Sequence, residues 1–311
     1  SLIIKKLVES IFPPEYVAVV LGGRAENQKL LDQKFDYIFF TGSKDVGHLV
    51  QEKASKYLTP ITLELGGKSP CIVDETANLK VSAARIVFGK YLNCGQTCVA
   101  PDYLLVHRSV KDELLTYLVQ EVKKQFGEKP LENVNFGKII NQKHFERLLG
   151  LIKDEKIIIG GESNSDENRI APTILDQITL DRPVMGEEIF GPILPVITYD
   201  KDEDIESIIA QNPTPLAFYL FTSRKDFADY LTHKVAFGGG CINDTIVHLA
   251  SSHMPFGGVG TSGMGGYHGK FGFDTFSHYK SILNKAYTPD LVLRYQPYTK
   301  SKFNLIKMFF K

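Results

Sequence analysis

The segment Tyr37-Ile38-Phe39-Phe40-Thr41-Gly42-Ser43 decides the fold, because it joins a short apolar run directly to a glycine turn. A helical pattern of polar and apolar residues follows it through Val50 and Ala54. A buried strand, a glycine turn and a helix in this order are typical of a parallel α/β sheet. The free N–H groups at such a helix start carry partial positive charge, so the same unit predicts a phosphate site.

Further apolar runs alternate with helical patterns along the chain, which is typical of an α/β protein. In the predicted helix over 81–92 we expect Ala84, Val87, Phe88 and Tyr91 to share the buried face. The Gly66-Gly67 pair marks the expected crossing between two domains. We expect strands at 16–21, 37–40, 61–65, 104–106, 157–159 and 194–197, and helices at 2–11, 81–92 and 110–126.

Composition excludes several classes of protein. The 311 residues, of which 43% are hydrophobic, are enough for a large core and two packed units. Lys plus Arg and Asp plus Glu are 36 each, and no basic block stands out, so we expect no nucleic-acid partner. The cysteines form no CxxC pair, which predicts a reducing, cytoplasmic setting, and we assign no metal site. These cysteines are Cys71, Cys94, Cys98 and Cys241.

The chain shows no membrane span. No apolar run reaches the length that a bilayer requires, and the first residues lack the layout of a secretory signal. The last segment, 302–311, alternates cations with apolar residues. Such an amphipathic tail lies on a lipid surface or, more often, packs on its own core or on a partner subunit, and both alternatives stay open.

Two motifs carry chemistry, Leu63-Glu64-Leu65-Gly66-Gly67-Lys68 and, further along, Asn93-Cys94-Gly95-Gln96-Thr97-Cys98. A thiol can add to a carbonyl carbon and hold the acyl group as a thioester, while a carboxylate can activate the water that releases it. The pair therefore predicts two-step acyl chemistry. The alternatives are a buried apolar Cys98 and a structural Glu64 that pairs with a lysine.

These motifs resemble the aldehyde dehydrogenase superfamily, in which the cysteine of a GQxC run is the nucleophile and the glutamate of an ELGGK run is the base. The segments 40–47, 187–192 and 255–260 match further family motifs in the family's order. The segments 98–103 and 263–270 are similar to the class 3 branch, whose members oxidise fatty, medium-chain and aromatic aldehydes. The resemblance implies NAD(P)-dependent oxidation of an apolar aldehyde to a carboxylic acid.

The resemblance also implies an aldehyde dehydrogenase-like α/β fold in three parts. A partial Rossmann-type NAD(P)-binding domain would cover 1–65, and an α/β catalytic domain would cover 66–254. The segment 255–311 would return to the cofactor domain and the oligomer interface, which gives a homodimer if the full chain is present. The resembled enzymes begin with a long segment that has no counterpart here, so we expect a piece of a longer protein.

The catalytic residues implied by the resemblance are Cys98 and Glu64, with Cys94 as the rival nucleophile. We expect amide dipoles, and the positive ring of the cofactor, to lower the pKa of Cys98. Apolar surroundings should raise the pKa of Glu64. The absent segment would contain the asparagine that helps to hold the oxyanion, which leaves the backbone N–H of Cys98 as the donor in this sequence.

The resemblance places the cofactor, NAD or NADP, and an aldehyde pocket on further residues. Gly42, Ser43 and Gly47 would bind the diphosphate, with Ser43 able to cap the helix, while Glu188 would accept the nicotinamide-ribose hydroxyls. The other cofactor-binding residues would be Leu65 and, beside the nicotinamide ring, Phe190. The aldehyde pocket would be lined by Tyr91, Leu92, Ile246, Phe256 and His268, for each of which ordinary core packing is the alternative. Two other functions remain open, a catalytically silent module and a weak cofactor-independent esterase.

Overall fold

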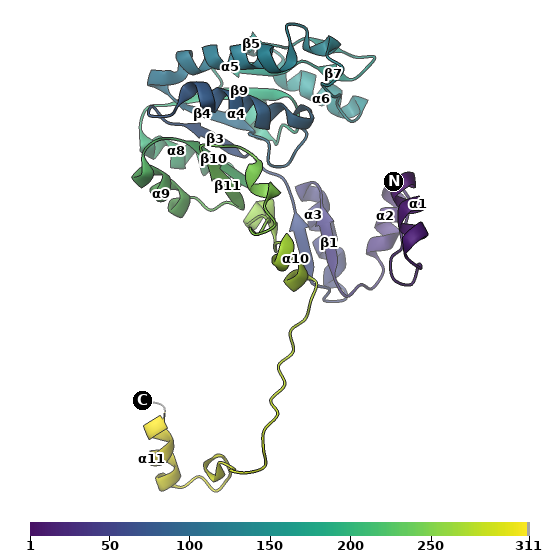
Figure 1. Cartoon of the computed structure of the whole chain (residues 1–311), viewed down its shortest axis with the longest axis vertical. Helices are drawn as coiled ribbons and strands as arrows, with labels where there is room; N and C mark the ends of the chain where they lie inside the picture. Colours follow the sequence, from purple (N-terminus) through teal and green to yellow (C-terminus); the bar gives the residue numbers. More distant parts are fainter. Residues whose placement is uncertain (310–311) are drawn as a thin grey trace. The chain divides into compact units, whose positions relative to one another are not determined.

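A seven-stranded sheet forms the centre of the fold in the computed structural model, which describes residues 1–309 (Figure 1). The strand order is β11-β10-β3-β4-β9-β8-β5, and all neighbours are parallel except β5, which is antiparallel to β8. The strands are β3 (Pro70–Val73), β4 (Tyr103–His107), β5 (Lys156–Ile159), β8 (Thr173–Asp176), β9 (Ile193–Tyr199), β10 (Ala217–Phe221) and β11 (Gly239–Ile242).

Helices cover both faces of this sheet, so its strands are buried on two sides and read as continuous apolar runs. Leu104 and Val106 of β4 pack under α4 (Leu79–Tyr91) and α5 (Lys111–Phe126). Tyr103 and Leu105 point to the opposite core. That core is closed by α6 (Gln142–Ile152), α7 (Pro183–Gly186), α8 (Asp202–Ile209) and α9 (Lys225–Lys234). The predicted α/β class is confirmed.

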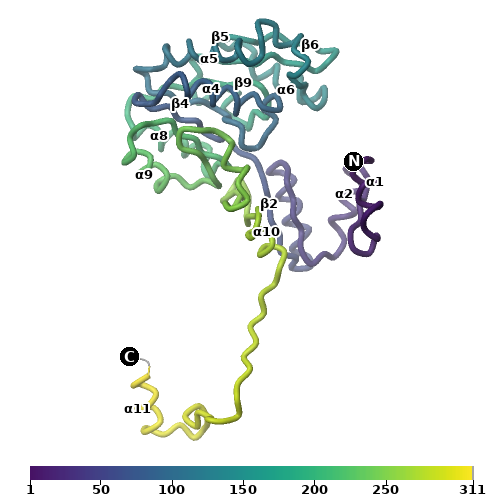
Figure 2. Tube along the Cα trace, in the orientation of Figure 1, coloured from purple at the N-terminus to yellow at the C-terminus, as the bar shows by residue number. Residues whose placement is uncertain are grey.

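A second, three-stranded sheet contains the segment that opened the sequence analysis. Its order is β1 (Ile38–Thr41), β2 (Ile61–Glu64) and β12 (Gly263–Met264), with β1 parallel and β12 antiparallel to β2. The helix α3 (Lys44–Ser55) packs on this sheet, where its Val50 joins Leu63 of β2 and Leu65, which follows β2, in a small core. The predicted strand, glycine turn and helix are confirmed. The trace in Figure 2 then leaves β2 and enters the larger sheet as β3.

The apolar run 16–21 is not a strand, contrary to the prediction. It is an irregular segment between α1 (Leu2–Ile11) and α2 (Arg24–Leu31), and the Tyr16 side chain is 83% exposed. A parallel strand needs a hydrogen-bonded neighbour and cover on both faces. Within residues 1–309, the segment 16–21 has neither a paired strand nor such cover. The one further sheet in this part of the chain is a two-stranded hairpin of β6 (Ser163–Asn164) and β7 (Arg169–Ile170).

The predicted face of the helix at 81–92 is also partly wrong. Val87 and Tyr91 are buried as expected, but Phe88 is 46% exposed and Ala84 is only partly buried. The buried face instead includes Ala83, Ile86 and the charged Lys90. The face is shifted by about one residue, because a lysine on the core side is not recognised by a count of apolar positions.

Residues 277–311 form a separate unit from residues 1–276, whose last helix is α10 (Gly269–Thr275). This second unit contains α11 (Lys300–Phe309), which covers most of the predicted amphipathic tail and buries none of its side chains. The tail's last two residues, 310–311, lie outside the described residues. None of the helices that the structure describes is both long and apolar enough to cross a bilayer.

Candidate functional site

The loop before Cys98 is a tight left-handed turn. The helix α4 ends at Tyr91, and a 3₁₀ turn, η1 (Leu92–Gly95), follows it directly. Asn93, Cys94 and Gly95 have φ values of 51°, 56° and 71°. A Cβ on Gly95 would lie 2.1 Å from the carbonyl oxygen of Gly191, so only glycine fits this turn. The glycine of the GQTC run therefore allows the loop to pack closely on its neighbour.

Gln96 then fixes this loop to a distant segment. Its Nε2 donates to the carbonyl oxygens of Asn93 and Lys138 at 3.2 and 3.0 Å. Its Oε1 accepts from the N–H of Ile140 at 2.9 Å. Because both ends of the amide are bonded, the side chain holds the turn that leads into Cys98. The glutamine of the GQTC run is therefore structural.

The Cys98 thiol is partly buried and protonated at neutral pH. Burial is the largest cause that raises its pKa, to about 11, and the carboxylates of Glu188 and Glu64 raise it further. The N–H groups of Cys98 and Val99 act in the opposite direction, but they are outweighed. The amide dipoles thus lower the pKa of Cys98 as expected, but their effect is smaller than that of burial. For the chain by itself the predicted direction of the pKa shift is therefore wrong. Cys98 needs a proton acceptor to react.

Glu64 ends β2 as a buried carboxylate, 4% exposed. Neither carboxylate oxygen has a hydrogen-bond partner among residues 1–309. Burial raises its pKa to about 8, which confirms the expected direction and cause. Since Glu64 also raises the pKa of Cys98, the structure brings the two predicted catalytic side chains within electrostatic range.

Tyr267 lies beside the same two groups, and the sequence analysis gave it no role. Burial raises its pKa first, followed by Glu64 and Cys98. Its backbone pairs with Phe256 through hydrogen bonds of 2.8 and 2.9 Å. Tyr267 belongs to the segment 263–270, whose resemblance to the class 3 branch could have drawn attention to it. Only tertiary contacts show that it lies beside Glu64 and Cys98.

Cys94, the rival nucleophile, occupies a different environment. It is 2% exposed and belongs to the core under α6, where its sulfur accepts the N–H of Gly137. Cys98 instead borders the core under α4. Its burial in this core favours a packing role for Cys94.

A buried ion pair holds the segment that carries Glu188. Lys68 donates to the carboxylate of Asp102 at 2.5 Å and to the carbonyl oxygens of Val184 and Glu187 at 3.0 and 2.9 Å. The other Asp102 oxygen accepts from the N–H of Ile189 at 2.9 Å. Lys68 belongs to the ELGGK run, but its partners lie far away in the sequence, so sequence reasoning missed its role.

The Glu188 side chain lies against the two glycines that follow Leu65. Its carboxylate accepts the N–H of Gly67, and a Cβ on Gly66 would lie 1.9 Å from it. Burial, ahead of the charge of Asp102, raises the pKa of Glu188 to about 7. The Gly66-Gly67 pair therefore leaves room for the Glu188 carboxylate. The same pair also links the two sheets.

We expect Lys68→Met to lower the free energy of unfolding by about 3–5 kcal/mol, because it leaves the buried Asp102 charge without its partner. Chemical denaturation of the full-length protein measures this loss. The matched control is Lys129→Met, whose exposed pair with Glu132 is screened by water and should contribute little to stability. Equal small losses in both variants would contradict the role assigned to Lys68.

The start of α3 is open, as a phosphate site requires. Ser43 is exposed at the N-cap position, but its side chain makes no capping hydrogen bond, so the cap considered for it is not formed. The N–H groups of the first turn therefore remain available. Gly47 is buried, and a Cβ there would lie 2.7 Å from the Leu65 side chain. Gly47 thus lets α3 approach the strand.

The predicted pocket residues differ in their surroundings. Ile246 and Phe256 belong to the core cluster that Cys98 and Tyr267 border. His268 stacks on Phe256 with ring centroids 5.3 Å apart, and Leu92 is exposed beside the nucleophile loop. Tyr91 differs, since it is 1% exposed and donates to the carbonyl oxygen of Thr173 at 3.0 Å. For Tyr91 the geometry favours the core-packing alternative.

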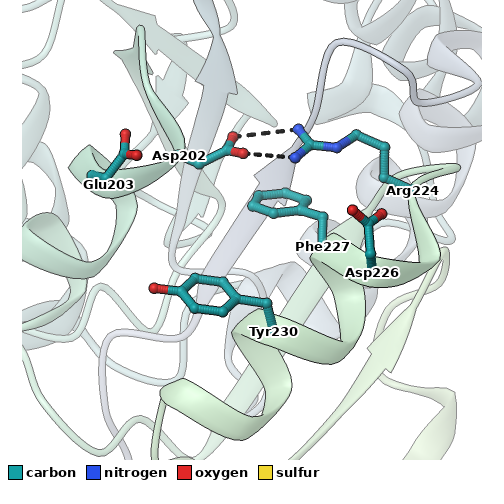
Figure 3. A pocket seen from close by; sticks show the side chains of 6 residues that line it. All are labelled: Asp202, Glu203, Arg224, Asp226, Phe227 and Tyr230. Atoms are coloured by element: carbon teal, nitrogen blue, oxygen red, sulfur yellow. Dashed lines mark hydrogen bonds and ion pairs between the residues drawn. The ribbon is translucent and has the colours of Figure 1, made fainter.

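One pocket on the surface is unrelated to these groups. Figure 3 shows Asp202 and Arg224 pointing toward each other, with the Phe227 ring under the guanidinium group. The ion pair spans 2.7 Å, so its charges satisfy each other. None of its lining residues belongs to the predicted site, so we assign no function to this pocket.

Comparisons with known proteins agree with the resemblance. A sequence profile described as the aldehyde dehydrogenase family matches residues 1–282. A 4,4′-diaponeurosporen-aldehyde dehydrogenase from Staphylococcus aureus is 49% identical over 99% of this chain and 68% of its own length. Aldehyde dehydrogenase family 3 member H1 from Arabidopsis thaliana is 44% identical over 99% of this chain and 64% of its own. The chain thus spans about two thirds of the length of these relatives.

Solved structures show the same fold. The substrate-bound state of Staphylococcus aureus AldH superposes with a TM-score of 0.96 at 49% identity, over 99% of this chain and 68% of that one. The Mycobacterium tuberculosis aldehyde dehydrogenase complexed with NAD+ gives a TM-score of 0.80 at 30% identity, over 89% and 59% of the two chains. The expected aldehyde dehydrogenase-like α/β fold is confirmed.

Proposed function

This chain belongs to the aldehyde dehydrogenase family, and we propose that the protein of which it is part oxidises an apolar aldehyde to a carboxylic acid with NAD or NADP. The family consists of enzymes, and aldehyde oxidation is their reaction. The observation that carries the proposal is the pairing of a buried, unpartnered Glu64 carboxylate with the Cys98 thiol. Two such groups rarely lie together without a chemical reason.

In the first step the Cys98 sulfur adds to the aldehyde carbon and forms a thiohemiacetal. The thiol proton must leave as the bond forms, because the thiol is protonated at neutral pH. That proton passes to water, so ionised Glu64 stays free to act as the base of the last step. The backbone N–H of Cys98 is a donor for the oxyanion.

The residues around Gly42 and Glu188 fit a nicotinamide dinucleotide, whose ring supplies the hydride acceptor when it is bound. The uncapped start of α3 at Gly42 and Ser43 suits a diphosphate, and Gly47 lets the helix pack on Leu65. The N–H of Gly67 and the Asp102–Ile189 hydrogen bond hold the Glu188 carboxylate and its segment, which supports a role in accepting ribose hydroxyls. Phe190 follows it with a 42% exposed side chain, which suits packing beside a ring.

In the last step Glu64 activates the water that releases the acid from the Cys98 thioester. Only the ionised carboxylate can take a proton from water. Because burial raises its pKa to about 8, a substantial part of Glu64 is protonated near neutrality, and the ionised part grows as the pH rises. A base with a pKa near the working pH is well matched to this task.

We propose an apolar substrate because the residues expected to line the aldehyde pocket are mainly aliphatic and aromatic. Leu92, Ile246, Phe256 and His268 would border a hydrocarbon tail. Burial of such a tail is worth about 25 cal/mol per Å² of apolar area, so longer aldehydes should bind more tightly than acetaldehyde. The chemistry of the lining supports a class of substrate and not a single compound.

We propose that the chain is divided into a partial cofactor domain over 1–65, a catalytic domain over 66–254 and a C-terminal segment over 255–311. We also propose a cytoplasmic homodimer for the full chain, since β11 ends the large sheet with an edge that offers backbone groups for pairing. Analytical ultracentrifugation showing a monomer would reject the dimer.

The experiment that tests this function begins with the intact mass of the purified protein, and then measures formation of reduced nicotinamide from a medium-chain aldehyde. Turnover by the full-length protein supports the proposal. A folded full-length protein without turnover for any of several apolar aldehydes and either cofactor would reject it. A folded 311-residue chain without turnover would instead match a silent module.

Weak esterase activity is a second candidate, because both Cys98 and Glu64 lie within residues 1–276 and need no hydride acceptor to cleave an activated ester. Hydrolysis of a nitrophenyl ester without NAD would support it if Cys98→Ala removed the activity. A flat trace with the parent protein would reject it.

A further inference from the structure

Tyr219 carries a buried hydroxyl group that the proposed reaction does not use. The residue lies in the middle of β10 and is 0% exposed. This strand is paired on both sides, with Tyr219 opposite Cys71 of β3 and Cys241 of β11. Its ring also meets the His248 imidazole edge-on, with ring centroids 5.9 Å apart. Tyr219 is therefore a fixed point of the large sheet.

The hydroxyl group of Tyr219 reaches the loop of the predicted nucleophile. It donates to the carbonyl oxygen of Val99 at 2.5 Å. Val99 follows Cys98 directly and is itself 0% exposed. A phenol group buried in an apolar core needs such a partner, and a buried carbonyl group that loses its donor is costly. The contact joins a paired strand to the residue beside the thiol, across 120 positions of the sequence.

Cys98 and Val99 are the two central residues of a tight turn. The N–H of Ala100 closes this turn by donating to the carbonyl oxygen of Thr97 at 3.0 Å. The carbonyl group of the third residue takes no part in the closure of such a turn, so it can accept a hydrogen bond from outside. The peptide group between Val99 and Ala100 is therefore held twice, by its N–H within the turn and by its oxygen from Tyr219.

The shape of this turn sets the direction of the amide groups beside the thiol. The N–H groups of Cys98 and Val99 favour the thiolate, against burial and the carboxylates of Glu188 and Glu64. The N–H of Cys98 is also the proposed donor for the oxyanion. Gln96 holds the chain before the turn. Tyr219 holds the far side of the same turn, so the nucleophile lies between two fixed points.

We propose that Tyr219 is a positioning residue for Cys98, whose hydroxyl group fixes the turn that presents the thiol. It acts through the Val99 carbonyl group and not on the aldehyde. Loss of the hydroxyl group would release one of the two bonds on the 99–100 peptide and let the neighbouring N–H groups turn away from the sulfur. The thiolate would then form less readily. The effect on turnover rests on the proposed function, whereas the effect on the free thiol does not.

The test is alkylation of Cys98 by iodoacetamide in the full-length protein at pH 8, without aldehyde or cofactor. Tyr219→Phe keeps the ring and removes the donor. We expect the rate constant for Cys98 to fall about tenfold, because iodoacetamide reacts with the thiolate. Mass-spectrometric fragmentation distinguishes alkylation at Cys98 from alkylation at Cys94. A merely structural role of Tyr219 predicts the opposite sign, since a loosened core exposes the thiol and speeds its alkylation.

Tyr199→Phe is the matched control. Tyr199 is also buried, at 2% exposure, and its hydroxyl group donates to the carbonyl oxygen of Val73 in β3 at 3.5 Å. Its removal should leave the alkylation of Cys98 unchanged. Unchanged or faster alkylation in Tyr219→Phe, with an intact fold by circular dichroism, would overturn the inference. Equal slowing in the two variants would also overturn it.

Tyr219→4-aminophenylalanine is a second variant, which keeps a weaker N–H donor at the same place. We expect its alkylation rate to lie between those of the parent and Tyr219→Phe. If Tyr219→Phe does not fold, a rate below that of the parent in the second variant supports the inference. A rate at or above that of the parent overturns it.

Single-turnover formation of reduced nicotinamide separates this inference from the proposed function. We expect Tyr219→Phe to slow the first turnover about tenfold, with the KM for the aldehyde unchanged, because a misplaced nucleophile impairs the chemical step and not substrate binding. A parent protein without any turnover would reject the proposed function. The alkylation result would still decide the role of Tyr219, since it needs neither aldehyde nor cofactor.

Discussion

Cys98→Ala is expected to abolish aldehyde oxidation in the full-length protein, with a loss of about 10⁴-fold or more in kcat. The reason is that no thiohemiacetal or thioester can form without the sulfur, so neither hydride transfer nor acid release has an intermediate to act on. Formation of reduced nicotinamide with a saturating apolar aldehyde measures the loss. Circular dichroism should show an intact fold, because Cys98 only borders the core.

Cys94→Ala is the matched control for this change. The residue stands four positions earlier and is fully packed under α6, so its loss should reduce the free energy of unfolding while turnover at low temperature continues. Trapping with a labelled aldehyde followed by mass spectrometry should place the acyl group on the peptide that contains Cys98. Turnover by Cys98→Ala together with its loss in Cys94→Ala would assign the nucleophile to Cys94.

Glu64→Gln is the second change with a large expected effect. An amide cannot accept a proton from water, so we expect the thioester on Cys98 to accumulate and steady-state turnover to fall about 10²–10⁴-fold. Gln is close to Glu in size, and the buried Glu64 oxygens lose no hydrogen bond described within residues 1–309, so the fold should persist. Intact-mass spectrometry after a single addition of aldehyde and cofactor should show an acylated protein.

The exposed Glu132 supplies the control, since Glu132→Gln should change neither turnover nor acylation. Glu64→Gln protein that turns over at the parent rate, with no acyl adduct, would refute the role of Glu64 in releasing the acid. A slow first step without an adduct would instead place Glu64 in the attack by Cys98.

The parent protein should also show a pH dependence that Glu64→Gln lacks. Release of the acid requires ionised Glu64, and burial raises the pKa of this group to about 8. The rate of release should therefore rise as the pH increases through about 8, and it should fall below that pH as the carboxyl group takes up a proton. Pre-steady-state release from the acylated protein measures this profile, and a flat profile would contradict it.

Much of the architecture was determined by the sequence. The strand before Gly42, the strand that ends at Glu64 and three strands of the large sheet, β4, β5 and β9, are local patterns that were predicted within a few residues, whereas β3, β8, β10 and β11 were not predicted. The two motifs that contain Glu64 and Cys98 could be recognised because they are contiguous runs of residues. Each of these patterns is defined by residues that are adjacent in the sequence, so it can be detected without knowledge of any tertiary contact.

Tertiary structure decided the rest. The run 16–21 has the composition of a strand but no neighbour to pair with in the part of the chain that the structure describes. The pKa of Cys98 rises because Glu188 and Glu64, from two other elements, add to the effect of burial. Lys68 has its role only through partners such as Val184, which lies 116 residues further along the chain. Periodicity tells which residues are apolar, but only the folded chain brings a buried charge to its counter-charge.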